Sequence, residues 1–336
     1  MMTEITAVPD DPLPRTHLDT ADRWAPWEVL PLSHEHRGLF ERHLAMVGAS
    51  ISDYSFAGNC CWQSHQHLFV ALVEGCLCLF AARDDGLHMP LPPLGATADL
   101  PAATAACVAL MERCNPARSA AAIYFATPAF IDAIRWGAPD LADRLHDVRL
   151  AGSDFIYRTA DLVELRGVDY KSKRSDINQL LRAHPDARVE PLGVEHADAV
   201  RDLCLLWLRQ RGIATEGRPP SMYGIEEELH AIVYAANNLD ALGLVGARLI
   251  VDGELAGFTI GERLVTGDGN VLFEKTNLAI PGASQLLFRE FCRTLLECPR
   301  ITTGDGGGCE SLARAKMSYR PIELADKFVL TFGRSP

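Results

Sequence analysis

Charged side chains stand inside apolar strands and beside glycines in the C-terminal third of this sequence. Glu274 and Lys275 lie in the apolar run of residues 271–277, and Asp305 lies among the glycines of residues 304–308. A charge that leaves water is costly unless it finds a partner or a ligand. We therefore expect a functional site in this part of the chain.

Glu274 and Lys275 are neighbours on an expected strand, so their side chains should point to opposite faces. At most one of them serves a cleft unless a bulge intervenes. We expect Glu274 to face the cleft, where a carboxylate can accept a proton from a nucleophile. Lys275 is a candidate for substrate binding. The alternative is that both are solvated strand residues.

Three further charges follow on a helix expected over residues 309–317. Glu310 is a candidate catalytic carboxylate and Arg314 a candidate substrate-binding group. They are four residues apart, so a simple helix salt bridge would explain them equally well. Lys316 lies about 120° around the helix from Glu310 and can reach a different partner.

The glycine-rich segment 304–308 resembles a phosphate cradle, since glycine lets backbone N–H groups approach an anion ahead of a helix. No lysine and hydroxyl follow in P-loop order, which argues against a nucleoside triphosphate. The alternative is an ordinary Asp-Gly turn.

A second group of charges forms a short basic run between the two halves of the chain. Its members are Arg166, Lys171, Lys173 and Arg174. Such a run suits the phosphates of a nucleic acid, where each contact adds salt dependence rather than sequence reading. The alternative is the solvated start of a helix.

The overall composition sets limits on these hypotheses. The chain has 336 residues and a net charge of −12, which argues against a generally basic nucleic-acid binder but allows a local basic stripe. No apolar run approaches the roughly 20 residues that span a bilayer. The N-terminus lacks the features of a secretory signal, so we expect a cytoplasmic location.

Cysteine and histidine spacings give no metal site. The ten cysteines contain no C-x-x-C pair, and we interpret them as reduced, buried core residues. The pairs His34/His36 and His65/His67 lack a third ligand at a suitable offset, so we predict no metal.

Hydrophobic periodicity divides the chain into an arm and two α/β units. Residues 1–28 are proline-rich and acidic, 29–185 form the first unit with a basic connector at 165–182, and 186–336 form the second unit with the active site. In the second unit helices precede an antiparallel meander, whose first turn, Asp252-Gly253, is a strong hairpin signal. We therefore predict an α/β (α+β) fold of tandem GNAT-like acyltransferase domains, with mostly antiparallel sheets.

Several peptides in order along the chain resemble one known family, the phosphatidylglycerol lysyltransferase C-terminal domain (DUF2156). They run from Ser52-Asp-Tyr-Ser-Phe-Ala through Phe273-Glu-Lys-Thr-Asn to Arg314-Ala-Lys-Met-Ser-Tyr. The resemblance implies aminoacyl-tRNA as co-substrate, with no further cofactor. The family's polar strand before the last helix is replaced here by Thr302-Thr-Gly-Asp-Gly-Gly-Gly, which implies a reshaped pocket.

The resemblance also implies roles for individual residues. Lys316, in the family's R/K-x-K-x-S-Y pattern, would stabilise the oxyanion or the leaving group, and Tyr319 of the same pattern would bind substrate. Asp305 would hold the amino group of the transferred residue. The basic run would bind tRNA, and segment 304–308 could admit the terminal adenosine or a bulky aminoacyl group.

The preferred function is transfer of an amino acid from tRNA to a soluble small-molecule amine, hydroxyl or hydroxylamine, within a biosynthetic pathway. The alternatives are a phosphatidylglycerol aminoacyltransferase at the membrane surface, an acyl-coenzyme A-dependent transferase, and a binding module that has lost the chemistry. The coenzyme A alternative is weakened because the segment before helix 282–297 lacks the usual pyrophosphate-binding turn.

Overall fold

The computed structural model describes residues 24–83, 86–116, 119–212 and 224–333. Its strands form a four-stranded sheet of order β1-β2-β3-β4 and an eight-stranded sheet of order β5-β12-β6-β11-β10-β9-β8-β7. The first sheet contains β1 Leu30–Pro31, β2 His67–Val73, β3 Cys76–Arg83 and β4 Gly86–His88. The second contains β5 Ala121–Ala126, β6 Leu145–Arg158, β7 Arg188–Pro191, β8 Val245–Val251, β9 Glu254–Arg263, β10 Gly269–Thr276, β11 Arg300–Thr302 and β12 Glu323–Phe332.

The helices cover both sheets. In the first half they are α2 Arg37–Val47, α3 Phe56–Cys61, α4 Leu100–Cys114, α5 Pro128–Gly137, α6 Pro139–Ala142, α7 Thr159–Glu164 and α8 Lys171–Ala183. In the second half they are α9 Ala197–Gln210, α10 Ile225–Asn237, α11 Leu239–Leu242, α12 Ala283–Thr294 and α13 Glu310–Met317. None of those in the described ranges is long and apolar enough to cross a membrane.

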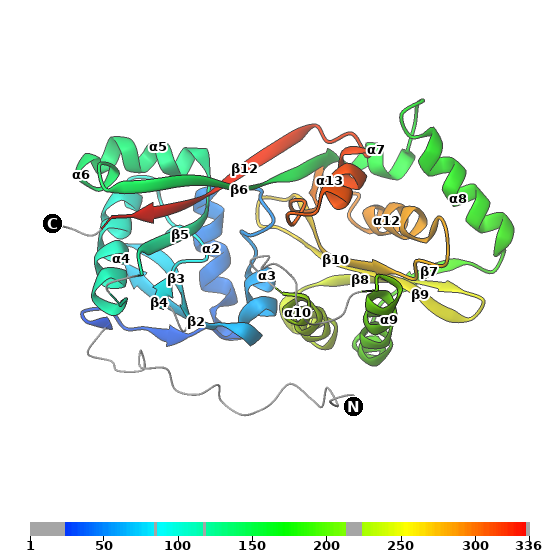
Figure 1. The fold of residues 1–336 in the computed structure, drawn as a ribbon, viewed down its shortest axis with the longest axis horizontal. Helices are drawn as coiled ribbons and strands as arrows, with labels where there is room; N and C mark the ends of the chain where they lie inside the picture. The colour runs from blue at the N-terminus through cyan, green and yellow to red at the C-terminus, as the bar shows by residue number, and fades with distance from the viewer. Residues whose placement is uncertain (1–23, 84–85, 117–118, 213–223, 334–336) are drawn as a thin grey trace.

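Two long strands join the halves of the molecule. β6 and β12 pair antiparallel from Leu145↔Phe332 to Ile156↔Glu323, and Figure 1 shows them running side by side from one half to the other. β12 comes from the second predicted unit but pairs with β5 and β6 of the first. The division at residue 185 stays a prediction, and the eight-stranded sheet contains strands from both sides of it.

The core is also shared between the halves. One cluster joins Phe40 and Leu79 of the first half to Val200, Ile232 and Phe273 of the second. α9 and α10 thus pack one face of the large sheet against the first half. A second cluster packs α7, α8 and α12 on the opposite face.

Among the described strands of the eight-stranded sheet, only β10 and β11 pair in parallel, and this pairing is short. β10 and β11 pair at two positions, Gly269↔Ile301 and Asn270↔Thr302. β10 continues for six residues beyond Asn270, whereas β11 ends at Thr302 and the chain turns into the glycine-rich segment. The sheet therefore opens between the end of β10 and segment 303–309, the place where the charged residues gather.

Most elements agree with the sequence predictions. The hairpin at Asp252-Gly253 is confirmed, with φ of +51° and +83° at its two residues, as a two-residue type I′ turn requires. β12 begins at Glu323, four residues before the strand that the sequence predicts over 327–332. The sequence does not predict β6, because its exposed stretch has no alternating pattern, or the short elements β1, β4, β7, α6, α7 and α11. The basic connector contains α8, whose Ile177 and Leu180 are buried against α12.

Candidate active site

A fully buried lysine, Lys327, holds three segments of the chain together. Its side chain is 3% exposed, and its Nζ lies 2.5 Å from Asp53 Oδ2, 3.0 Å from Asp154 Oδ1 and 3.0 Å from Asp305 Oδ2. The carboxylates come from the loop before α3, from β6 and from the glycine-rich segment. We call these four residues the Lys327 cluster.

Local geometry in β6 and β12 makes this cluster possible. Lys327 pairs with Gly152, and a bulge follows at once in β6, which re-aims the neighbouring side chains. An added Cβ on Gly152 would stand 2.6 Å from Asp305 Oδ2. Glycine at this position therefore lets the Asp305 carboxylate approach the strand and reach Lys327.

The cluster carries more negative than positive charge, and the pKa values reflect this. Burial raises the pKa of Asp53 to about 6, with the neighbouring carboxylates adding to the shift and Lys327 opposing it. Burial alone would lower the pKa of Lys327, but the three carboxylates outweigh it and the net shift is upward. For Asp305, burial acts upward and is outweighed by Lys327 and the N–H of Gly307, so its pKa is lowered.

Lys316 lies on the other side of the same segment. Its Nζ donates hydrogen bonds to the backbone carbonyls of Thr303 and Asp305, each at 2.5 Å. Burial lowers its pKa to about 8, although Asp305 and Asp154 favour the charged form. An ammonium group has three donors, and in the described part of the chain the remaining one has no hydrogen-bond acceptor.

Glu274 of β10 lies near enough to Lys316 for the charges of the two side chains to interact. Its carboxylate accepts hydrogen bonds from Ser284 Oγ at 2.7 Å and Thr259 Oγ1 at 3.3 Å. Burial raises its pKa to about 7, against these two hydrogen bonds and the positive charges of Lys275 and Lys316. Glu274 and Lys316 therefore both titrate near neutral pH, a feature common at catalytic sites.

Lys275 points to the opposite face of the sheet. Its Nζ lies 2.6 Å from Glu228 of α10 and 4.6 Å from the ring centroid of Trp207 of α9. The expectation that Glu274 and Lys275 face opposite sides is confirmed, and the structure does not bring Lys275 together with Lys316.

A groove of about 330 Å³ opens beside Asp305. Its walls come from β6, segment 306–308, α13 and β12. The residues used below are Ala151, Phe155, Gly307, Ala313, Met317 and Leu324, and Asp305 is the one charged residue in the lining.

The remaining candidates on and after α13 are dispersed. Glu310 and Arg314 are both exposed. Tyr319 packs edge-on to Phe288, with ring centroids 5.1 Å apart, and lies under Lys173 Nζ at 4.4 Å. Its burial raises its pKa beyond the normal range for tyrosine. Of the predicted residues, Asp305 and Glu274 thus both interact with Lys316, and Tyr319 also lies near enough to Glu274 for that carboxylate to raise its pKa.

Two side chains of the basic run, those of Lys173 and Arg174, make contacts within the protein. Arg174 donates to the carbonyl oxygens of Leu165 and Gly167, and Lys173 lies over the Tyr319 ring. Arg166 and Lys171 are exposed, and Arg166 pairs with Glu164 at 3.1 Å. Two of the four predicted tRNA contacts therefore have their charges facing solvent.

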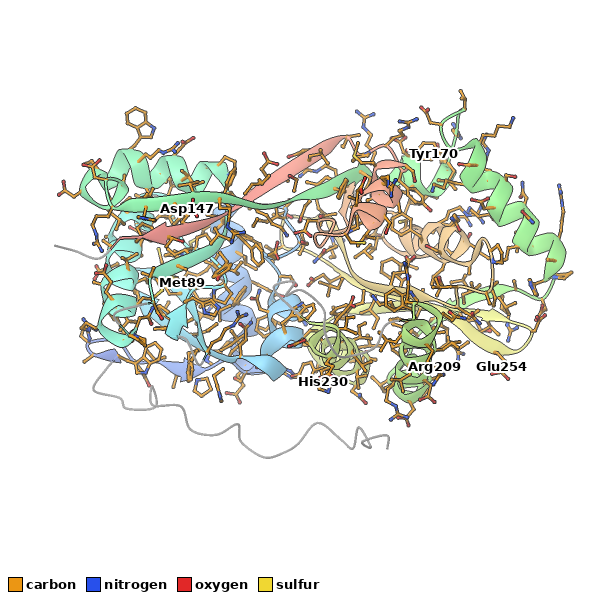
Figure 2. All side chains as sticks on the ribbon, in the orientation of Figure 1. Met89, Asp147, Tyr170, Arg209, His230 and Glu254 are labelled. Carbon is orange, nitrogen blue, oxygen red and sulfur yellow. The ribbon has the colours of Figure 1, made fainter. Side chains whose placement is uncertain are left out.

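Tyr170 supports the junction between this run and α13. Its hydroxyl donates to the Tyr319 carbonyl at 2.9 Å, and Figure 2 shows it where α7 and α8 meet, beside α13. Tyr157 of β6 similarly donates to the Lys316 carbonyl at 2.9 Å. These two tyrosines fix the C-terminal end of α13, which carries Lys316.

Another buried carboxylate, that of Glu262, lies between the two halves of the molecule. Glu262 of β9 accepts hydrogen bonds from Ser55 Oγ and, at 3.0 Å, from Asn270 Nδ2. Burial raises its pKa to about 7, and the two hydrogen bonds limit the shift. Ser55 also accepts from the Gly58 N–H at 2.7 Å and caps α3.

Sequence reasoning missed Lys327, Asp53, Asp154 and Glu262. One signal existed for Lys327, because a lysine in phase with Ala325 and Val329 of a mostly apolar strand is expected to point inward. No local signal distinguishes Asp154, whose partners are all far away in sequence.

Thiols and histidines form no metal site in the described residues, where no group of three or more His, Cys, Asp or Glu could hold a metal ion. Nine cysteines are buried and free, as predicted, whereas Cys309 is exposed at the start of α13. His34 bonds to the Tyr234 hydroxyl at 2.9 Å, and the His65 side chain lies outside the described residues.

One family model matches most of the chain. A family model described as phosphatidylglycerol lysyltransferase, C-terminal, matches residues 44–331, which include the Lys327 cluster, Glu274 and Lys316. Among curated protein sequences no relative matches.

Three solved structures share the fold. A conserved protein of unknown function from Bacteroides thetaiotaomicron is 22% identical with a TM-score of 0.80, covering 92% of this chain and 99% of that one. The C-terminal domain (DUF2156) of a protein described as a lysylphosphatidylglycerol synthetase, from Agrobacterium fabrum, has a TM-score of 0.62 at 15% identity, covering 90% and 93%. L-PGS from Bacillus licheniformis has a TM-score of 0.60 at 14% identity, covering 89% and 92%. The predicted fold class, mixed α/β with mostly antiparallel sheets, is confirmed, and its tandem GNAT-like kind stays a prediction.

Proposed function

The chain belongs to the phosphatidylglycerol lysyltransferase C-terminal family, and from this membership we propose that it transfers an amino acid from an aminoacyl-tRNA to an acceptor. The observation that carries the proposal is the placement of Lys316, a lysine of lowered pKa that is held by two backbone carbonyls and interacts with the charge of Glu274. An aminoacyl ester is already activated, so positioning and charge stabilisation can supply the catalysis.

The proposed reaction assigns one proton to each group. Glu274 accepts the proton of the acceptor's amine or hydroxyl as that atom attacks the ester carbonyl. Lys316 stabilises the oxyanion and then gives a proton to the departing ribose oxygen. The acceptor–acyl bond forms, the ester bond breaks, and the proton on Glu274 returns to Lys316 through solvent. The pKa values of about 7 and 8 suit a base and an acid at neutral pH.

We propose a small soluble amine, hydroxyl or hydroxylamine as acceptor. The net charge of −12 disfavours an anionic membrane surface, which attracts basic segments. The same charge repels tRNA at long range, so we assign its docking to local basic side chains, Arg166 and Lys171.

A transfer assay tests the proposal. Purified protein is incubated with tRNA charged with labelled amino acids and with the small-molecule fraction of a cell extract, and labelled products are followed by mass spectrometry. Product formation should stop after RNase treatment and should not need phosphatidylglycerol vesicles. Lys316→Met should lower turnover about 100-fold or more, whereas Arg188→Ala on β7 should not.

Two results would contradict this. If product forms from acyl-coenzyme A and its formation is insensitive to RNase, the donor is acyl-coenzyme A and not aminoacyl-tRNA. If product forms only when vesicles are present, the donor is still aminoacyl-tRNA but the acceptor is a lipid.

The tRNA contacts have a separate test. Replacing Arg166 and Lys171 by Glu should weaken tRNA binding and reduce the slope of log K against log[salt] by roughly one unit for each contact. Arg209→Glu on α9 is the control at an exposed arginine elsewhere (Figure 2). An unchanged slope would remove both residues from the tRNA surface.

A further inference from the structure

The side chains that line the groove beside Asp305 are apolar except for Asp305 itself and Ser153, whose hydroxyl donates to Asp326 at 2.5 Å. Phe155, Met317 and Leu324 provide large apolar surfaces, and Ala151, Ala313 and Gly307 keep the space open. Asp305 stands at one end as the single charged residue of the lining. This combination suits a ligand that carries one positive charge next to an apolar group.

Asp305 also links the groove to Lys316. Lys316 Nζ bonds to the backbone carbonyl of Asp305, and the Asp305 side chain extends from that same residue toward Lys327. The Phe155 ring, which lines the groove, lies with its centroid 5.9 Å from Lys316 Nζ. The carboxylate, the amine and the groove therefore lie within the span of one aminoacyl group.

We infer that the groove receives the side chain of the transferred amino acid and selects a neutral, apolar residue over a cationic one. This rests on the proposed function. The α-ammonium group binds the Asp305 carboxylate, the ester carbonyl faces Lys316, and the side chain enters the groove.

The charge of the lining sets the preference. A lysine side chain placed there would bring its ε-ammonium against Met317 and Leu324, with no carboxylate in the lining except the one that holds the α-ammonium. The ammonium group must then either lose its hydration, which costs free energy, or turn back to solvent, which gives up apolar contact with the groove. An acidic side chain would be repelled by Asp305.

A matched pair of ligands tests this. The probes are 3′-amino-3′-deoxyadenosine carrying norleucine or lysine in a stable amide link, because the two side chains differ mainly in the terminal charge. Isothermal titration calorimetry should give a Kd for the norleucyl probe at least about tenfold below that for the lysyl probe.

A negative charge placed in the groove should shift the preference toward the lysyl probe. Met317 is 46% exposed, so Met317→Glu is expected to fold normally, and it should lower the Kd of the lysyl probe relative to the norleucyl probe by about tenfold or more. Leu312→Glu, on the same helix but outside the lining and 44% exposed, should leave the ratio unchanged. Thermal melting confirms that both variants fold.

The inference is overturned if the lysyl probe binds as tightly as the norleucyl probe, or if Met317→Glu leaves their ratio unchanged. Either result leaves the proposed function intact as long as RNase-sensitive transfer is observed. If no transfer is observed and neither probe binds, both the proposed function and this inference fall.

Discussion

Replacing Lys327 by Met tests whether its ammonium holds the site together. The substitution keeps an apolar stem of similar length but leaves three carboxylates around it. One of them, Asp154, is fully buried, and the ammonium's contacts are 2.5–3.0 Å long. Each such contact is worth about 5.5–6.6 kcal/mol at an effective dielectric constant of about 20, and the desolvation of the charges offsets much of this.

Removing one partner of a buried ion pair typically costs about 3–5 kcal/mol. We expect a loss of that size in the free energy of unfolding at pH 8, measured by urea denaturation. The loss should shrink toward pH 5. Without Lys327 the carboxylates hold protons more tightly in the folded protein, so acidification neutralises them and relieves their repulsion.

Lys275→Met is the matched control, because that lysine pairs with the single carboxylate of Glu228. It should cost less, about 1.5–3 kcal/mol. Adding Asp53→Asn to Lys327→Met should recover part of the loss, since it removes one uncompensated charge. A loss below about 1 kcal/mol, or one that does not vary with pH, would refute the view that electrostatics in this cluster stabilises the fold.

Three further predictions concern neighbouring residues. Glu262→Gln should raise the free energy of unfolding by up to about 3 kcal/mol at pH 8 and change it little at pH 4. The reason is that the pKa of Glu262 is about 7 in the folded protein and lower in the unfolded chain, so the ionisation of Glu262 weakens the fold as pH rises. Exposed Glu254→Gln (Figure 2) should show no such pH dependence, and equal curves for the two variants would contradict the burial argument. Gly152→Ala should cost about 1–3 kcal/mol in urea denaturation by pushing Asp305 from Lys327, whereas Gly38→Ala in α2, with 3.6 Å to the nearest atom, should not destabilise. Turnover should fall above about pH 8 as Lys316 loses its proton, and a rate that keeps rising to pH 10 would exclude it as the acid.

The sequence by itself determined most of the helices and strands and identified three charged residues of the site. Period-2 and period-3.6 patterns predicted β8–β10 and the helices α9, α10 and α12, because one face of each must be buried. Charges beside glycines and inside strands identified Glu274 and Asp305, since such positions need a partner, and the family's R/K-x-K-x-S-Y pattern identified Lys316. These are local signals, and each can be seen within a short stretch of chain.

Only the tertiary structure decided which charges meet. Lys327 depends on carboxylates at positions 53, 154 and 305, which no local pattern relates to one another. The structure also separated Lys275 from Glu274 and committed Arg174 to two backbone carbonyls. The free energy of burying a charge is set by what surrounds it in space, and here those surroundings come from segments up to 274 residues apart in the chain.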